Sequence, residues 1–437
     1  MPLFMRRLIF YFTLGTFLIA APTIILYTAG FRYNFKQKRI VKTGAIILSS
    51  DPKNAEISLN GRPRQEHTPA RILNLTPGDY TVRVASEGFQ PWQKTLRVES
   101  EQVTLAENIT LFRQGSPERI AEGNIPSLLP EPAGENILFV REEGSFYEIW
   151  RHTDGRNSLL WRSALQSQPQ LIEWSSKRNE VLLFAGEYFL LDMDPPAPEL
   201  KSLTQLTGKT WKSLAYGKNQ TLLFGISGET LYSINPNTGA ADVIEQASEN
   251  FTIAPNEIYT SSADTEGTLL KLIRGATSST LTRIESGAWT WAAASDPWLI
   301  LADLKREKLA VVNAKTKEIS EIDGTRALFL PGEEVTLLAS TDFEIWRYRP
   351  STKKTELLTR LSEPIQKILI TELKNAFIAV TDHHVYALEL DTRGKQNSSE
   401  LATFDSIQSA SLDRHGKILY LAAEKNNTPG LWRVEIR

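Results

Sequence analysis

The chain has 437 residues, which is too long for one ordinary hydrophobic core, so we expect two or three folded units. Its 49 basic and 51 acidic residues give a formal net charge of −2. No long run of one sign stands out, which argues against a nucleic-acid partner. The absence of cysteine excludes a disulfide framework, a thiolate nucleophile and cysteine-ligated metal sites, and it leaves the redox compartment open.

The first predicted element is an apolar helix. Leu8 to Ala29 contains no charged residue, and a helix of this length covers roughly 30 Å, the thickness of the hydrocarbon core of a bilayer. We expect the lipid bilayer to be the partner of residues 8–29, within a region 1–30 that consists of a short basic tail and a transmembrane helix. A cleaved signal peptide, cut after Tyr27-Thr28-Ala29, is the alternative.

A basic juxtamembrane linker is expected at residues 31–42. The basic residues after the helix are Arg32, Lys36, Lys38, Arg39 and Lys42, and those before it are Arg6 and Arg7. By the positive-inside rule, the side of the helix with more basic residues faces the cytoplasm, and a literal count places the C-terminal part there. The family resemblance given below points outward, and we predict a single-pass membrane protein with extracytoplasmic C-terminal domains. The basic residues also suit contact with anionic lipid headgroups, although simple flanking of a membrane helix explains them equally.

From Thr43 onward the apolar residues alternate with period two. Tyr80, Val82 and Val84 fall on one face of an extended segment, as in strands with one buried face. Asn60-Gly61 is a hairpin signal, because both residues tolerate the positive φ of a type I′ turn. Residues 43–113 are therefore predicted to form a small β-sandwich of five to seven short strands.

This segment resembles the PEGA domain. The matching residues, in chain order, are Ser50-Asp51-Pro52-Lys53-Asn54-Ala55, Ile57, Leu59, Asn60-Gly61, Thr68-Pro69, Leu75-Thr76-Pro77-Gly78-Asp79-Tyr80 and Gly88-Phe89-Gln90-Pro91-Trp92. Lys53-Asn54 departs from the Glu-Gly of the family's name, which bears on turn geometry rather than on catalysis. The resemblance implies an envelope-associated binding module. Turn geometry alone explains the glycines and prolines of the motif, so we interpret them as structural.

Residues 116–437 contain a repeat. Eight apolar runs follow polar turns, with starts 36 to 44 residues apart, at Ile137, Val181, Leu222, Ile258, Trp298, Val335, Phe377 and Ile418. A period near 40 built from short strands is typical of propeller blades. We therefore predict an all-β chain that ends in an eight-bladed β-propeller, closed by a strand near 118–122. Seven blades are the alternative, if the weak repeat near Ile258 is an insertion.

The sequence contains no Walker loop, dinucleotide fingerprint, His-Glu-x-x-His motif or Gly-x-Ser-x-Gly elbow. Asp382-His383-His384 is the only histidine cluster. We assign it to a hairpin loop, because adjacent histidines of a strand point to opposite faces and cannot readily share a metal. We expect a protein that is not an enzyme, with no catalytic residue, metal site or cofactor.

Aromatic residues recur on the presumed innermost strands of successive repeats. Rings at the mouth of a central channel are suitable platforms for sugars or peptides, and the candidate ligand-binding residues are Trp174, Trp211, Trp289 and Trp291. Ordinary core packing between blades is the competing interpretation.

Together these features predict a membrane-anchored cell-envelope binding or scaffold protein. Its propeller would present a face to an unknown envelope protein or glycan. The alternatives are a propeller enzyme acting on cell-wall polysaccharide and a cytoplasm-facing scaffold. The identity of the ligand and the oligomeric state stay open at this point.

Overall fold

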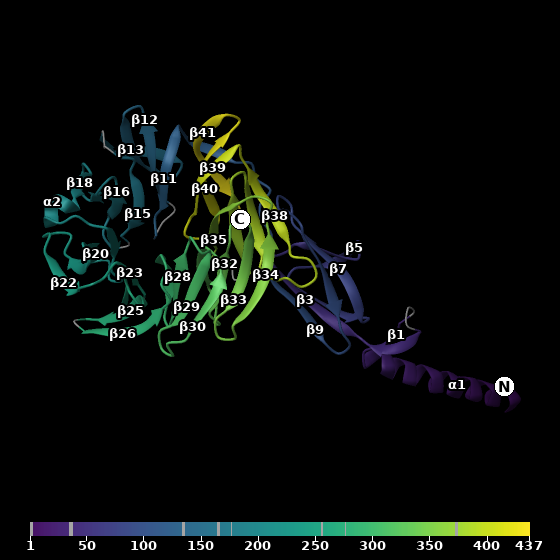
Figure 1. Cartoon of the computed structure of the whole chain (residues 1–437). Coiled ribbons are helices and arrows are strands. Elements are labelled where there is room, and N and C mark those ends of the chain that lie inside the picture. The colour runs from purple at the N-terminus through teal and green to yellow at the C-terminus, as the bar shows by residue number, and fades with distance from the viewer. Residues whose placement is uncertain are drawn as a thin grey trace. The chain divides into compact units, whose positions relative to one another are not determined.

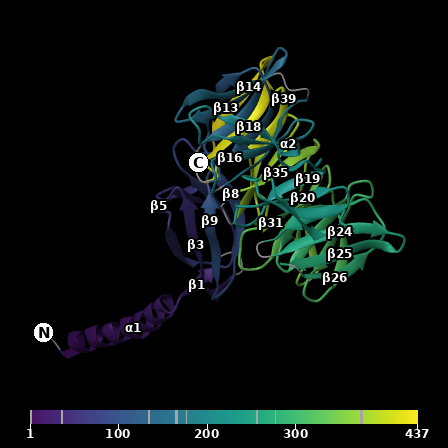
Figure 2. The same ribbon diagram turned by 90° about the vertical axis from the view of Figure 1, so that its left-hand side faces the viewer.

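The computed structural model describes residues 3–34, 38–132, 136–163, 167–175, 177–254, 257–275, 277–371 and 375–437. The chain forms two compact units. One comprises Met1–Arg113 together with Asp391–Asn397, and the other comprises Gln114–Leu390 together with Ser398–Arg437. Strands dominate both units (Figures 1 and 2), so the all-β prediction is confirmed.

The first unit begins with the long apolar helix α1 (Leu3–Thr28). The part from Phe4 to Thr28 has a mean hydropathy of 2.0, and its side chains are not buried in the protein. The hydroxyl groups of Thr16 and Thr23 donate to the carbonyl oxygens of Phe12 and Ile19, four residues earlier. These two hydroxyl groups are thus satisfied within the helix, as a hydrocarbon environment requires. By length and composition α1 is able to cross a bilayer.

The segment after α1, which we expected to be a basic juxtamembrane linker, contains two paired strands. β1 (Phe31–Asn34) pairs with β2 (Arg39–Lys42) as an antiparallel two-stranded sheet, with Tyr33 opposite Ile40. Arg32, Arg39 and Lys42 therefore lie on these strands, Lys38 directly precedes β2, and Lys36 is outside the described residues.

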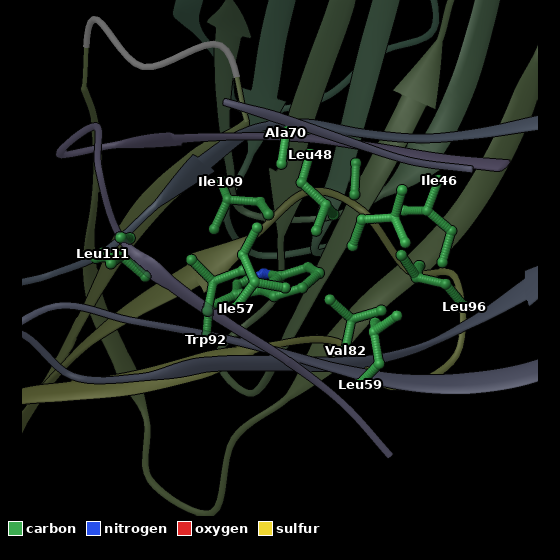
Figure 3. Packing of buried hydrophobic residues seen from close by; sticks show 14 of the residues in the cluster. Ile46, Leu48, Ile57, Leu59, Ala70, Val82, Trp92, Leu96, Ile109 and Leu111 are labelled. Atoms are coloured by element: carbon green, nitrogen blue, oxygen red, sulfur yellow. The ribbon is translucent and has the colours of Figure 1, made fainter. Parts of the chain in front are cut away.

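Seven strands follow and form two facing sheets. They are β3 (Gly44–Asp51), β4 (Glu56–Leu59), β5 (Arg62–His67), β6 (Ala70–Leu75), β7 (Gly78–Ala85), β8 (Trp92–Val98) and β9 (Val103–Thr110). One sheet has the order β6-β3-β9 and the other the order β5-β4-β7-β8. Apolar side chains of both sheets, among them Leu48, Ile57 and Trp92, point toward one another and make one core (Figure 3). Asn60 and Gly61, with φ of 49° and 75°, join β4 to β5 as predicted.

One inward position of β8 carries a lysine. Trp92, Leu96 and Val98 are buried and share a face with Lys94, whose side chain is fully buried. The Lys94 Nζ donates to the carbonyl oxygen of Asp391 at 2.6 Å and lies 3.4 Å from the Asp391 carboxylate. The segment Asp391–Asn397, although distant in sequence, is therefore part of this unit.

The second unit contains the repeats. Its first strands are β10 (Glu118–Glu122), β11 (Asn124–Pro130), β12 (Ile137–Glu143), β13 (Phe146–Thr153), β14 (Arg156–Ser163), β15 (Gln170–Trp174), β16 (Glu180–Phe184), β17 (Tyr188–Asp192), β18 (Glu199–Ser202), β19 (Ser213–Tyr216), β20 (Leu223–Ser227), β21 (Thr230–Ile234), β22 (Ala241–Glu245), β23 (Asn250–Ile253), β24 (Ile258–Asp264), β25 (Gly267–Arg274) and β26 (Thr277–Ile284). The remaining strands are β27 (Trp289–Ser295), β28 (Trp298–Asp303), β29 (Lys308–Asn313), β30 (Ile319–Asp323), β31 (Arg326–Leu330), β32 (Thr336–Ser340), β33 (Glu344–Arg349), β34 (Lys354–Arg360), β35 (Ile365–Ile370), β36 (Ala376–Thr381), β37 (His384–Glu389), β38 (Ser398–Thr403), β39 (Ser406–Leu412), β40 (Ile418–Lys425) and β41 (Thr428–Glu435). A single-turn helix, α2 (Leu203–Thr207), connects β18 to β19.

Within the described residues these strands form eight four-stranded sheets, and each apolar run of the repeat lies in or overlaps the second strand of one sheet. The weak repeat at Ile258 starts β24 of a complete sheet, so it is not an insertion. The segment 118–122 is β10, which pairs with β41 and completes the sheet of β39, β40 and β41. The chain thus supplies the predicted closing strand.

The sheets pack face to face in chain order (Figure 1). Seven hydrophobic clusters join successive sheets, from the pair around Phe139 and Tyr420 to the pair around Ile345 and Phe377. The eighth junction is made by Phe404 against Trp432, whose ring centroids are 5.7 Å apart, and by the Ile407 amide, which donates to the Asp382 carbonyl oxygen. This arrangement is a closed ring, as expected for a propeller.

Candidate functional site

The innermost strand of each sheet is its first strand in the chain, except in the sheet that β10 completes, where it is β39. Trp174 lies on β15 and Trp289 and Trp291 lie on β27, whereas Trp211 precedes β19 by two residues. Three of these four tryptophans are buried. Trp174, Trp211 and Trp289 are 4%, 8% and 4% exposed. The Trp211 Nε1 donates to the Thr207 hydroxyl at 3.1 Å, and the Trp289 Nε1 donates to the Glu285 carbonyl oxygen at 2.8 Å. All three rings pack in clusters between sheets, which agrees with the competing interpretation that they belong to the core. Their role in ligand binding stays a prediction.

Trp291 differs from the other three because it is only partly buried and lines a pocket. The pocket has a volume of about 310 Å³ and lies among the innermost strands β27, β31 and β35. The Trp291 Nε1–H is buried and has no hydrogen-bond partner among the described residues. A buried donor without a partner is costly, so this indole is a candidate to bond an incoming acceptor.

The charged residues that line this pocket are both cations. Arg326 comes from the start of β31 and Lys367 from β35, and no acidic side chain is among the described lining residues. The Lys367 Nζ donates to the Ala410 carbonyl oxygen at 2.8 Å. Desolvation lowers the pKa of the Lys367 ammonium, since burial disfavours the charged form. The Arg326 guanidinium lies 3.6 Å from the Asp342 carboxylate in an exposed ion pair.

Apolar and neutral polar groups complete the pocket. Leu328 and Ile368 contribute apolar surface, and Leu304 is 61% exposed. The Gln366 side-chain amide donates to the Asp382 carboxylate. The arrangement can therefore hold an anionic group beside an apolar one, a combination that matches an acidic peptide segment or a carboxylate-bearing sugar.

Sequence reasoning singled out Trp291 but missed Arg326 and Lys367. Each of these residues stands on a different repeat, and polar residues on an innermost strand resemble those of any exposed strand in sequence. A comparison of the innermost strands across repeats does not isolate Lys367 either, because Glu173 of β15 also follows a register shift in its strand.

The histidine cluster has a structural role. Asp382 and His383 form the turn between β36 and β37, as the predicted hairpin loop requires. The His383 Nδ1 is bonded to the Asp405 carbonyl oxygen at 2.8 Å, and the His384 Nδ1 is 3.0 Å from the Glu363 carboxylate. Among the described residues there is no group of three metal-ligating side chains.

A second hollow lies between the sheets β19–β22 and β23–β26. Its volume is about 760 Å³, and its lining is mainly apolar, with Phe224, Val243 and Ile273 among its residues. The acidic residue on its wall, Glu257, already accepts from the Tyr259 hydroxyl and the Arg274 guanidinium. Among the described residues, this hollow offers apolar surface but no pair of charged side chains of the same sign. We therefore regard the pocket at Lys367 as the candidate site.

Comparison with known proteins agrees with the architecture. Residues 43–111 match the PEGA domain. No curated protein matches the sequence significantly.

The C-terminal WD40 domain of Sif2 superposes with a TM-score of 0.51 and 13% identity, over 73% of this chain and 98% of that chain. Sqt1 of Saccharomyces cerevisiae gives a TM-score of 0.52 and 9% identity, over 74% and 98% of the two chains. At such identities the likeness concerns the fold alone. The chain thus contains a PEGA domain, preceded by an apolar helix long enough to cross a membrane and followed by a WD40-like β-propeller.

Proposed function

We propose that this chain is a membrane-anchored binding protein whose propeller captures a protein partner through an acidic segment. The observation that carries the proposal is the pocket among β27, β31 and β35. Its described lining residues include two cations and no acidic residue on a largely apolar wall. A ring-shaped scaffold with a ligand site among its innermost strands supports binding rather than chemistry.

The pocket chemistry favours a carboxylate. The ammonium of Lys367 is desolvated, which destabilises its charged form. A carboxylate beside it stabilises that charged form more than a water molecule does. A hydrogen bond between charged partners is typically worth about 1.5–3 kcal/mol. The indole of Trp291 supplies an unpaired donor and a flat apolar face beside the cations.

A catalytic role for the channel receives less support. Acid–base chemistry on a polysaccharide uses two carboxyl groups at a defined separation. Burial raises the pKa of Glu173, on the innermost strand β15, against hydrogen bonds from the Tyr216 amide and the Gln220 side chain. Its contacts in the described part of the chain are thus with an amide and a glutamine rather than with a second acidic residue.

The binding test uses the full chain and a peptide array. Peptides carry Glu between leucines, and the matched set carries Gln in its place. We expect retention of the acidic set, and a loss of about tenfold to a hundredfold in affinity in the Lys367→Gln and Arg326→Gln variants. Lys308→Gln is the matched control, because Lys308 pairs with Asp323 outside the pocket. Equal binding of the Glu and Gln peptides would contradict the proposal.

A glycan is the second candidate ligand, and the partly exposed ring of Trp291 is the observation in its favour. Aromatic faces stack on sugar rings without needing charge. Retention of neutral cell-wall polysaccharide that is lost in Trp291→Ala and kept in Lys367→Gln would select the glycan over the acidic peptide.

Membrane anchoring by α1 and an extracytoplasmic position belong to the same proposal. The length and hydropathy of α1 and the PEGA match support them, whereas the basic residues after α1 favour the opposite orientation. Because the chain lacks cysteine, Ser100→Cys provides a single exposed thiol. A membrane-impermeant maleimide should label it on whole cells, and labelling only after lysis would reverse the orientation.

A further inference from the structure

The hairpin of β1 and β2 begins within three residues of the end of α1. The main-chain amide and the hydroxyl of Thr43 both donate to the Gly30 carbonyl oxygen, at 2.9 and 3.0 Å. On the other side, the Ser100 hydroxyl donates to the Lys42 carbonyl oxygen, and Lys42 pairs with Glu101. These contacts hold the hairpin in place between the helix and the sandwich.

Arg32 links the hairpin to the last turn of the helix. Its guanidinium stacks 3.4 Å from the centroid of the Tyr27 ring, and its Nη1 donates to the Tyr27 carbonyl oxygen at 2.6 Å. A cation at this position satisfies a carbonyl of the helix C-terminus and interacts favourably with the helix dipole. At about 1.5 Å per residue, the 26 residues of α1 extend about 39 Å, which exceeds the hydrocarbon thickness of about 30 Å. If α1 spans a bilayer, the hairpin lies at the level of the headgroups.

The charge of this region is of one sign. The first acidic residue of the chain is Asp51, so every charged side chain before it is basic. Of the basic residues on the hairpin, Lys38 and Arg39 are exposed. Such a cationic stretch complements the phosphates of an anionic lipid surface.

The hairpin also exposes an apolar pair. Tyr33 and Ile40 are directly opposite each other in the sheet, and they are 50% and 58% exposed. Directly opposed residues of an antiparallel pair lie on the same face. An aromatic ring with a polar tip beside an aliphatic side chain is the composition that prefers the membrane interface.

We propose that β1 and β2, together with Lys38, form an interfacial lipid-binding element for anionic phospholipids. Lys38 and Arg39 approach the headgroup phosphates, while Tyr33 and Ile40 enter the interface. The inference rests on the membrane anchoring proposed above and extends it, because it assigns a lipid class to a folded element outside the apolar helix.

The experiment places a fluorophore on the hairpin of the full chain. The cysteine-free sequence allows Ile40→Cys to be labelled with an environment-sensitive dye and reconstituted into vesicles of phosphatidylcholine, with or without phosphatidylglycerol. We expect a several-fold rise in emission and quenching by spin-labelled lipid when phosphatidylglycerol is present. The matched control is Leu357→Cys, which is exposed at 43% in the second unit and should respond to neither lipid.

The charge requirement is tested by adding Lys38→Glu and Arg39→Glu to the labelled chain. The dye emission should then no longer depend on phosphatidylglycerol. High salt should remove the same dependence in the chain that keeps Lys38 and Arg39, because salt screens the charges. An unchanged melting temperature shows that the variant remains folded. If the chain floats with the vesicles but the dye stays in a polar environment with both lipids, the hairpin proposal is refuted and the anchor is retained. If the chain does not float with vesicles at all, the anchor itself fails.

Discussion

Asp391→Asn is expected to destabilise the first unit although this residue lies far along the chain from the PEGA domain. Burial of the Asp391 carboxyl opposes its ionisation, but hydrogen bonds from the side chain and amide of Arg393 and the charges of Lys94 and Arg393 outweigh it. They lower the Asp391 pKa to about 2. The substitution keeps the shape of the side chain and removes its charge, so the buried Lys94 ammonium loses the negative charge that lies 3.4 Å from it.

The size of the effect follows from the pKa. The difference between the ordinary value of 3.8 and the value of about 2 corresponds to about 2.4 kcal/mol in favour of the charged form in the folded protein. The side chain is 26% exposed, and solvent screening reduces this figure. We therefore expect a loss of about 2 kcal/mol in the free energy of unfolding of the first unit at neutral pH.

A buried thiol reports on this unit alone. Val84→Cys introduces one thiol in the sandwich core, where Val84 is fully buried, and its reaction with a thiol reagent across a denaturant series measures the opening of this core. Asp391→Asn in this background should shift the labelling midpoint to lower denaturant. Glu99→Gln is the matched control, because Glu99 forms an exposed ion pair with Arg97 at 3.7 Å, worth about 0–1 kcal/mol. Equal midpoints for Asp391→Asn and Glu99→Gln would refute the reasoning.

Three further predictions concern stability. Because the pKa of Asp391 is lowered in the folded chain, its contribution to the free energy of unfolding is complete above the pKa of the unfolded chain, near 4. This contribution is lost as the pH falls toward about 2. Pulse proteolysis by pepsin at acid pH should show this loss in the native chain and not in Asp391→Asn. Gly394 has φ of 67°, and a Cβ there would meet a backbone carbonyl oxygen at 2.6 Å. Gly394→Ala should therefore lower the free energy of unfolding in the thiol assay by at least about 1–2 kcal/mol. Gly115→Ala, whose Cβ would have its nearest neighbour at 3.6 Å, should be nearly neutral. Trp211→Ala and Trp289→Ala should each destabilise the propeller by roughly 3–5 kcal/mol, measured by circular dichroism melting; unchanged melting would contradict their assignment to the core.

Local sequence pattern accounts for much of the fold. The apolar runs lie in or overlap the second strands of successive sheets because a strand with both faces covered needs consecutive apolar residues, and that need is visible within a few positions. Asn60-Gly61 marks its turn because few other residues adopt two successive positive φ values. The closing strand at 118–122 was predictable because the last repeat lacked its fourth member.

The candidate site was only partly predictable. The recurrence of tryptophan along the innermost strands is visible in the sequence, but whether a ring is covered depends on the neighbouring sheet. Trp289 is enclosed whereas Trp291, two residues later, borders a pocket. Arg326 and Lys367 meet there because two repeats are adjacent in the ring, and no local signal marks either of them.

The position of Lys94 follows from the sequence alone, whereas its binding partner is known only from the tertiary structure. Its phase with Trp92 and Leu96 places it on the inward face of a strand, because alternation depends only on the neighbouring residues. The group that makes a buried ammonium tolerable there is 297 residues away, in Asp391. Only the folded chain brings the two together, since the cost of burying a charge is offset by a partner in space, whatever its position in sequence.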